Sequence, residues 1–172
     1  NQITDNVKEA IKKSKEKGVK VVLCTGRPLK GVEDFLEELN LKEEGDYVTT
    51  FNGALVQDAY TGKPISHLTL DYNDLCDLYN LSLKIGSRSH FYDTKTVYTF
   101  NLDVSDYTIL ESYLTGAHLN VTTLDKVPKD IGMSKFMMID HPEILDECIK
   151  KIPEEYYEKY TIVRSTPFFL EI

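Results

Sequence analysis

The stretch 19–28, with the sequence VKVVLCTGRP, constrains the fold more than any other part of the chain. Its first part, Val19 to Cys24, is short and rich in β-branched and apolar residues, which is typical of a strand covered on both faces. A Thr-Gly-Arg-Pro turn follows, and Pro28 fits the first turn of a helix because it loses no main-chain hydrogen bond there. Apolar residues from Val32 to Leu39 then recur at helical spacing. The stretch therefore predicts a strand, a sharp turn and the start of a helix.

The turn after this strand is a candidate phosphate site. It would place the Thr25 hydroxyl and the Gly26 amide at the carboxyl end of a parallel strand, facing the N-terminus of the helix. Free amides and the positive end of the helix dipole favour an anion in such a place, and ligands of open α/β sheets bind at this edge. Thr25 would equally suit an ordinary helix cap, since caps favour Ser and Thr. The residues of this turn alone leave both interpretations open.

The segment after the helix predicts a second strand at Tyr47 to Phe51, which completes a strand-helix-strand unit with parallel strands. Asn52-Gly53 ends this strand, so we expect this pair at the same sheet edge as the first turn, although Asn-Gly is also a common hairpin turn. Ala54 to Asp58 and Pro64 to Leu70 then predict a β-hairpin. Residues 1–70 are thus predicted to form an α/β segment with a parallel sheet.

From Asp71 onward the pattern changes. The order from Asp71 to Arg164 is helix, two strands, helix, two strands, helix and strand, which is typical of an α+β domain with helices on one face of an antiparallel sheet. No low-complexity linker separates this part from the first, so we interpret it as an insertion into the first domain. The predicted domains are a core segment at 1–70, an α+β domain at 71–164, and a strand at 165–172 that returns to the core.

Composition and charge disfavour several classes of protein. The formal net charge of -8 argues against nucleic acid as a partner, because binding to the phosphate backbone needs clustered Lys and Arg. The apolar runs are far shorter than a membrane span and no signal peptide opens the chain, so we expect no membrane contact. Cys24, Cys76 and Cys148 form no paired pattern, which fits a reduced, cytoplasmic location. The chain begins at Asn1 without Met, which indicates a fragment, a processed form or a trimmed sequence.

Four blocks in this order and spacing resemble the haloacid dehalogenase superfamily. They are VVLCTGRP at 21–28, FNGA at 51–54, FMMID at 136–140 and PFFLEI at 167–172. The chain is most similar to the Cof-type branch with a class IIB cap, and within it to sugar-phosphate phosphatases. The resemblance implies a Rossmann-like core that carries an inserted α+β cap. It also implies a phosphatase of small phosphorylated metabolites that works through an aspartyl-phosphate intermediate.

The same resemblance implies roles for the residues around the first turn. Thr25 would be the catalytic hydroxyl that hydrogen-bonds the transferring phosphoryl group, and the Gly26 amide would hold the same oxygens. Asn52 and Gly53 would line the core side of the pocket. Arg27 would reach the substrate or the cap, with a structural salt bridge as the alternative. Phosphoryl transfer depends on positioning and charge stabilisation, so such donors are the expected equipment.

The cap is expected to supply substrate specificity. Candidates are polar residues of its sheet: Arg88 and Lys135 would suit the charge of a sugar phosphate, and His90 and Tyr92 would suit its hydroxyls. Each of these residues would also be unremarkable as an ordinary surface residue.

The chain also departs from the family pattern. The aspartate nucleophile and the acid/base aspartate of the family belong on a strand before residue 4, and the third and fourth motifs that help hold Mg²⁺ belong after Ile172. We therefore assign no metal ligand to these residues, expect Mg²⁺ to be held elsewhere, and expect the chain alone to be inactive. A non-catalytic module that binds a phosphorylated small molecule is the alternative. A nucleotide-binding protein is less favoured, since no Gly-x-Gly-x-x-Gly or P-loop pattern occurs. The oligomeric state stays open.

Overall fold

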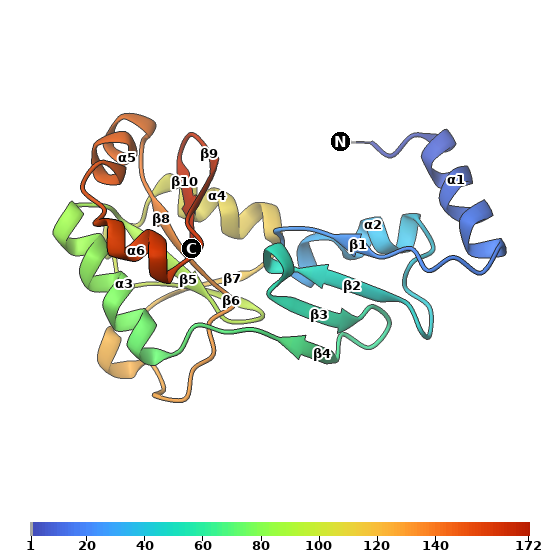
Figure 1. Ribbon diagram of the computed structural model, residues 1–172, viewed down its shortest axis with the longest axis horizontal. Coiled ribbons are helices and arrows are strands. Elements are labelled where there is room, and N and C mark those ends of the chain that lie inside the picture. The colour runs from blue at the N-terminus through green and yellow to red at the C-terminus, as the bar shows by residue number, and fades with distance from the viewer. Residues whose placement is uncertain (1) are drawn as a thin grey trace. The chain divides into compact units, whose positions relative to one another are not determined.

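The computed structural model describes residues 2–172 and separates into two units, the first ending at Leu68 and the second running from Thr69 to Ile172. Figure 1 shows that each unit has its own sheet and its own helices. No helix within residues 2–172 has the length and apolar character needed to cross a membrane.

The first unit carries a four-stranded sheet in the order β1-β2-β3-β4. Its strands are β1 (Leu23–Cys24), β2 (Tyr47–Thr50), β3 (Leu55–Asp58) and β4 (Pro64–His67). β1 and β2 are parallel, with Leu23 opposite Val48, and α2 (Glu33–Glu38) lies between them in the chain. The later strands pair antiparallel. The predicted strand-helix-strand unit and hairpin are therefore present, but the helix start is corrected: a 3-10 turn spans Leu29–Gly31 and α2 begins only at Glu33.

β1 is shorter and more exposed than the predicted strand. Only Leu23 and Cys24 pair with β2, and the side chains of Val19 and Val22 are exposed. Among the strands of residues 2–172, β2 is the one neighbour of β1. Within the described residues, β1 therefore pairs along one edge only. Its exposed side chains also show that the predicted burial on both faces is wrong.

The core of the first unit lies between its helices and its sheet. One cluster of buried apolar residues consists of Val32, Leu36, Leu41, Val48 and Ala59. α1 (Asp5–Glu16) contributes Ile11 to the edge of this cluster and is also held by charge. Lys15 Nζ lies 2.9 Å from Asp46 Oδ2, at a carboxylate that is itself buried. This unit therefore packs α1 through an ion pair as much as through apolar contact.

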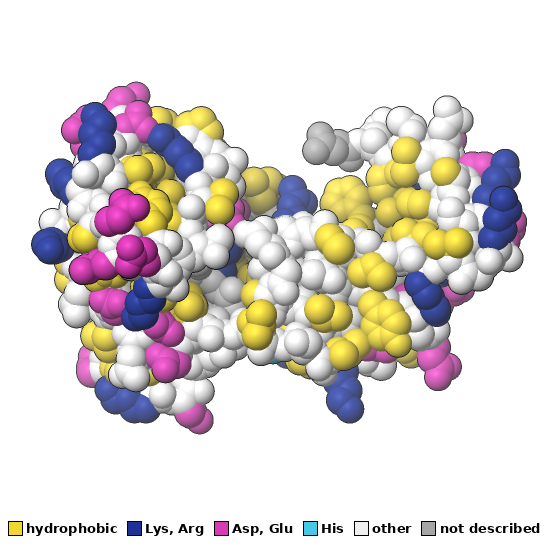
Figure 2. Space-filling view, in the orientation of Figure 1, with side chains coloured by type: hydrophobic (Ala, Val, Ile, Leu, Met, Phe, Trp, Pro, Cys, Tyr) yellow, Lys and Arg dark blue, Asp and Glu magenta, His cyan; other side chains and the backbone are white. Residues whose placement is uncertain are grey.

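The second unit carries a six-stranded sheet in the order β7-β6-β5-β8-β10-β9. Its strands are β5 (Ser89–Tyr92), β6 (Thr96–Thr99), β7 (His118–Val121), β8 (Lys135–Ile139), β9 (Val163–Thr166) and β10 (Phe169–Glu171). Neighbours pair antiparallel except β6 and β7, which are parallel. Figure 2 shows acidic and basic side chains intermixed on the visible face of this unit.

The helices of the second unit are α3 (Tyr72–Ile85), α4 (Asp106–Thr115), α5 (Pro142–Ile149) and α6 (Glu154–Lys159). α3 begins where predicted, because the Asp71 carboxylate accepts hydrogen bonds from the Asn73 and Asp74 amides in a capping box. It ends at Gly86, whose φ of 86° is the left-handed conformation that glycine adopts without strain. Leu75, Leu78 and Ile85 face the core from α3.

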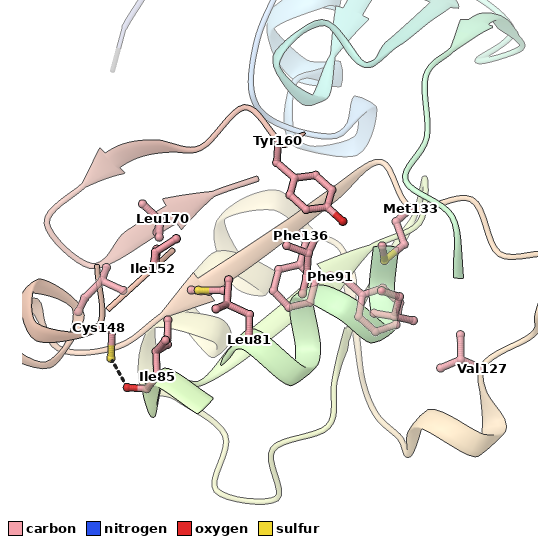
Figure 3. Close-up of a cluster of buried hydrophobic side chains, with 14 residues drawn as sticks. Leu81, Ile85, Phe91, Val127, Met133, Phe136, Cys148, Ile152, Tyr160 and Leu170 are labelled. Atoms are coloured by element: carbon pink, nitrogen blue, oxygen red, sulfur yellow. Dashed lines mark hydrogen bonds between the residues drawn. The ribbon is translucent and has the colours of Figure 1, made fainter. Parts of the chain in front are cut away.

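The main apolar core of the molecule lies under α3 and α5. Figure 3 shows Leu81, Phe91 and Phe136 converging in this cluster from α3, β5 and β8. Cys148 of α5 joins it and donates through Sγ to the Ile85 carbonyl at 3.4 Å. This is the buried role that a free cysteine commonly takes.

α4 covers the opposite face of the same sheet. Phe91 of β5 points into the core, whereas His90, its neighbour, lies 3.1 Å from the Thr108 hydroxyl of α4 through Nδ1. Successive strand residues point to opposite faces, so α3 and α4 sandwich β5. The structure thus differs in detail from an antiparallel sheet with helices on one face. β6 and β7 are parallel neighbours, and a parallel connection needs a crossover helix.

The C-terminal strand belongs to the second unit and not to the first. β10 pairs with β8, with Leu170 opposite Met138, and hydrogen bonds of 3.0 and 2.8 Å between Ile172 and Phe136 extend the pairing. Leu170 is buried in the cluster under α3. The predicted boundaries at 70 and 164 are corrected accordingly: the division falls after Leu68, and the expected return strand at 165–172 completes the second sheet.

Candidate functional site

Thr25 lies just beyond the end of β1 and is fixed by the second strand on both sides of its backbone. Its amide donates to the Thr49 carbonyl at 2.9 Å, and its carbonyl accepts from the Asn52 amide at 3.1 Å. These bonds continue the parallel pairing of β1 and β2 past the ends of the strands. The structure thus brings the turn at 25–27 and the turn at 51–53 to the same sheet edge.

The Thr25 side chain is partly exposed at this edge. Its Oγ1 accepts a hydrogen bond from the Arg27 amide at 3.1 Å, which closes the turn. A hydroxyl has one donor in addition to its lone pairs. Within residues 2–172 that hydrogen has no protein acceptor, so it can be donated to a bound anion.

Gly26 is in close contact with Asn52. A Cβ atom built on Gly26 would lie 2.5 Å from Asn52 Oδ1, a distance that real side chains do not reach. Only glycine therefore fits while the Asn52 carboxamide holds its place. Gly53 follows with a φ of 102°, which also favours glycine. The geometry places an exposed amide side chain directly over the turn that carries Thr25.

Arg27 is exposed, and its Nη1 donates to the Gly31 carbonyl at 3.3 Å. No carboxylate within residues 2–172 lies within ion-pair distance of its guanidinium. The alternative of a structural salt bridge is therefore not found in the described residues.

The described residues do not supply a metal site. Within residues 2–172, no three His, Cys, Asp or Glu side chains come together in a way that would hold a metal ion. The divalent cation implied by the family resemblance therefore has no ligand set among the described residues.

Arg88 of the second unit is committed to two carboxylates. Its Nη1 lies 2.9 Å from Asp140 Oδ1, and its Nη2 pairs with Asp103. The hydrogen bond with Asp103 is the main cause that raises the pKa of Arg88 above its usual value. The expected role of this cation in binding substrate would require it to leave both partners.

His90, Tyr92 and Lys135 are buried under α4 and do not line a surface. His90 is 1% exposed and Lys135 is 5% exposed, and the Lys135 Nζ lies 3.3 Å from Glu171 Oε2. Tyr92 donates its hydroxyl to Glu111 Oε1 at 3.2 Å. Burial lowers the pKa of His90 well below its usual value and raises that of Tyr92. The structure corrects their expected exposure, because α4 crosses the sheet face that these side chains share.

Two features of this region were not predicted from the sequence. The first is the buried cluster formed by Lys135 with Glu111 and Glu171, whose members are far apart in the sequence. The second is the backbone of Phe51, which has a φ of 50°. A pattern of apolar and polar residues carries no signal for either feature.

Comparisons with known proteins point to one family. Residues 1–172 match the sequence pattern of a family described as haloacid dehalogenase-like hydrolase. The chain is 51% identical over 172 residues to "Putative phosphatase YxeH" of Bacillus subtilis (strain 168), covering 100% of this chain and 64% of that protein. It is 43% identical over 173 residues to "Putative phosphatase M6_Spy0533" of Streptococcus pyogenes serotype M6, covering 99% and 63%. The chain thus spans less than two thirds of the length of these curated relatives.

Solved structures share the fold at low sequence identity. A haloacid dehalogenase-like hydrolase from Bacteroides thetaiotaomicron matches 99% of this chain and 64% of its own, with a TM-score of 0.79 and 22% identity. TM0651 from Thermotoga maritima matches 98% and 64%, with a TM-score of 0.75 and 19% identity. The HAD subclass IIB sugar phosphatase BT4131 matches 99% and 62%, with a TM-score of 0.70 and 17% identity. The mixed α/β fold is therefore that of class IIB members over part of their length.

Proposed function

The chain belongs to the haloacid dehalogenase-like hydrolase family, and from this premise we propose that it forms part of a phosphatase of small phosphorylated metabolites. One observation carries the proposal. The Thr25 hydroxyl, with a hydrogen left to donate, lies at the carboxyl edge of a parallel strand pair, beside an exposed Asn52 carboxamide. Such an edge is where open α/β sheets bind ligands. The names of the two curated relatives support the same reaction class.

The residues of the first unit would act by positioning and charge stabilisation. Thr25 would donate its hydroxyl hydrogen to an oxygen of the phosphoryl group, and the Gly26 amide would hold the same group. Asn52 and Gly53 would line the pocket beside it. Arg27 would meet the charge of the substrate with its exposed guanidinium. Donors set in place before the reaction are the largest single source of stabilisation in such transfers.

We further propose that the substrates are sugar phosphates and that the reaction passes through an aspartyl-phosphate intermediate. The fold shared with a class IIB sugar phosphatase supports the substrate class. Asp5 is not the nucleophile in this proposal, because it opens α1 and does not follow a strand. The nucleophile and the Mg²⁺ ligands are proposed to lie outside these residues, so the chain alone is expected to be inactive.

The test is Mg²⁺-dependent release of phosphate from a panel of sugar phosphates. The 172-residue chain and the full reading frame that contains it are assayed side by side. We expect activity in the longer form only, and Thr25→Ala should lower its kcat by about 10² to 10³-fold, as expected when one transition-state donor is lost. Thr61→Ala, at an exposed hairpin turn of the same unit, is the control and should leave kcat unchanged. Activity of the 172-residue chain that survives Thr25→Ala would contradict the assignment.

A non-catalytic module that binds a phosphorylated small molecule is the alternative outcome. It would rely on cations of the second unit, yet Arg88 and Lys135 are both engaged by carboxylates. No observation favours it over catalysis. Absence of phosphate release from both forms, with retained binding of a sugar phosphate, would move the assignment to this alternative.

A further inference from the structure

Three consecutive residues after β2 have a left-handed backbone. The φ angles are 50° at Phe51, 56° at Asn52 and 102° at Gly53. Glycine adopts this conformation freely and asparagine tolerates it, but a bulky residue such as phenylalanine is an outlier there. Backbone strain of this kind persists only where the surrounding structure holds it, and it is concentrated at functional sites.

Two consecutive amides of this left-handed run donate hydrogen bonds to the turn that carries Thr25. The Phe51 amide donates to the Arg27 carbonyl at 3.3 Å, and the Asn52 amide donates to the Thr25 carbonyl at 3.1 Å. Gly26 lies between these two acceptors. The turn at 25–27 is therefore bonded to the second strand on both sides of the glycine, and the same run sets the Asn52 carboxamide against Gly26.

The ring of Phe51 provides the anchor for this arrangement. Phe51 is 2% exposed, whereas Asn52 and Gly53, the two residues that follow it in the bend, are exposed. Burial of a large aromatic side chain is a strong stabilising contribution, and it offsets the strain of the backbone that carries it. The Phe51 carbonyl also accepts from the Ala54 amide at 3.1 Å, which ties the far end of the bend.

We infer that Phe51 is a positioning residue for the turn at 25–27. Its buried ring fixes the left-handed bend, and the bend fixes the carbonyls of Thr25 and Arg27 and the carboxamide of Asn52. Phe51 itself does not meet the substrate. The inference deepens the proposed function, on which it rests for the claim that this turn is the phosphate site. The placement of the turn by Phe51 is a separate claim that is tested without any assay of activity.

The first test measures amide hydrogen exchange in the 172-residue chain. Phe51→Gly keeps the left-handed backbone accessible and removes the ring, so the Asn52 amide should exchange about tenfold faster or more. The Ala59 amide, which donates to the Asp46 carbonyl at 2.9 Å in the same unit, should be unchanged. Asn40→Gly relieves another left-handed residue, with a φ of 54°, and should leave the Asn52 amide as in the wild type.

A milder variant keeps this test decisive if Phe51→Gly loosens the whole unit. Phe51→Leu retains an apolar side chain, so the unit should fold and the Asn52 amide should still exchange about threefold faster relative to Ala59. Phe51→Tyr retains the ring and should restore the wild-type ratio. An unchanged ratio of the Asn52 and Ala59 exchange rates in Phe51→Leu would overturn the inference.

The second test uses the full reading frame and asks whether Phe51 acts through Thr25. Phe51→Leu should lower kcat about tenfold with KM changed less than about twofold, because alignment and not binding is lost. In a Thr25→Ala background the same substitution should have little further effect on kcat. Additive effects on kcat would overturn the link to Thr25. Absence of phosphate release from the wild type would reject the proposed function and leave the exchange result to decide on Phe51.

Discussion

At the scale of single residues, the contact between Gly26 and Asn52 makes a sharp prediction. A methyl group on Gly26 would lie 2.5 Å from Asn52 Oδ1, so Gly26→Ala must displace the Asn52 side chain. Asn52 is an exposed residue, so we expect this displacement to change the free energy of unfolding by less than about 1 kcal/mol. In the full reading frame kcat should fall about tenfold, since a pocket-lining group has moved. Urea unfolding and phosphate release measure the two effects.

A second variant tests whether Gly26→Ala lowers kcat by displacing the Asn52 side chain. Asn52→Gly removes the carboxamide, so adding Gly26→Ala to it should cost nothing further in kcat. A further loss of activity in the double variant would show that Gly26 acts by its own backbone and not through Asn52.

The buried cation of the second unit makes a prediction about stability. Lys135 lies 3.3 Å from Glu171 and 3.9 Å from Glu111, with 6% of its side chain exposed. Lys135→Met would leave two largely buried carboxylates without their cation, and we expect a loss of about 3 kcal/mol in the free energy of unfolding. Lys150→Met removes an exposed cation from its pair with Glu147 and should cost less than about 1 kcal/mol. Equal losses in chemical denaturation of the two variants would contradict the burial of Lys135.

At the scale of elements, the sequence predicted the start of α3 and the parallel pairing of β1 with β2, but it did not predict which face of α4 is buried. α3 has a clear cap at Asp71 and an apolar stripe that meets an apolar core. α4 has its apolar residues outward: Ile109, Leu110, Tyr113 and Leu114 are exposed, whereas Thr108 and Thr115 are buried. Helical periodicity would instead turn apolar residues such as Leu110 and Leu114 inward, because it assumes an apolar surface beneath the helix.

The sheet face beneath α4 is polar. This explains why α4 buries its polar side, and why the polar strand residues expected at the surface are buried instead. His90, Tyr92 and Lys135 point to that face from β5 and β8, and Thr108 and Glu111 of α4 meet them. Strand alternation reveals that these polar residues share a face, but it does not reveal whether water or a helix covers it. In contrast, the meeting of the turns at Thr25 and Asn52 followed from the parallel strands, since both turns leave the same sheet edge.

The attachment of α6 to α3 makes a prediction about pH. The Tyr160 hydroxyl donates to Asp74 and Asp77, and the Tyr156 hydroxyl donates to Asp77 at 2.7 Å. Burial opposes the charge of Asp77, but these bonds and Lys159 outweigh it and lower its pKa below the usual 3.8. A carboxylate with a lowered pKa stabilises the fold above pH 3.8, and this contribution is lost as the pH falls through its folded pKa.

Asp77→Asn tests this attachment. At pH 7 it should lower the free energy of unfolding by about 1 kcal/mol, since charge-assisted hydrogen bonds are lost. The difference from the wild type should shrink as the pH falls below 3.8, because the wild-type carboxylate then also becomes neutral. Glu155→Gln removes a charge from α6 at an exposed position and should show no such convergence. A difference that stays constant across this pH range would assign the effect of Asp77 to something other than its charge.

At the scale of the whole molecule, the division into two units gives the C-terminal residues a structural role that differs from the predicted one. β10 lies between β8 and β9 in the second sheet, and Leu170 is buried in the cluster with Phe136. Without residues 165–172, β8 would lose one of its two antiparallel neighbours, and the apolar cluster would lose a buried leucine. The second unit should therefore need these residues to fold, although the sequence suggested that they serve the first unit.

The prediction is that residues 69–172 fold alone and that residues 69–164 do not. The longer piece retains the six-stranded sheet and the whole cluster under α3, so it should unfold cooperatively in urea with dispersed amide resonances. Loss of the buried Leu170 side chain alone is expected to lower the free energy of unfolding by about 2 to 5 kcal/mol. The unpaired edge of β8 would lower it further. Together these losses are a large part of the total stability of a small domain. Leu170→Ala in the longer piece isolates the packing contribution, and Leu102→Ala, at an exposed leucine, is its control. If residues 69–164 proved as stable as residues 69–172, β10 would not be an integral part of this sheet. The prediction that residues 165–172 return to the first unit would then be favoured again.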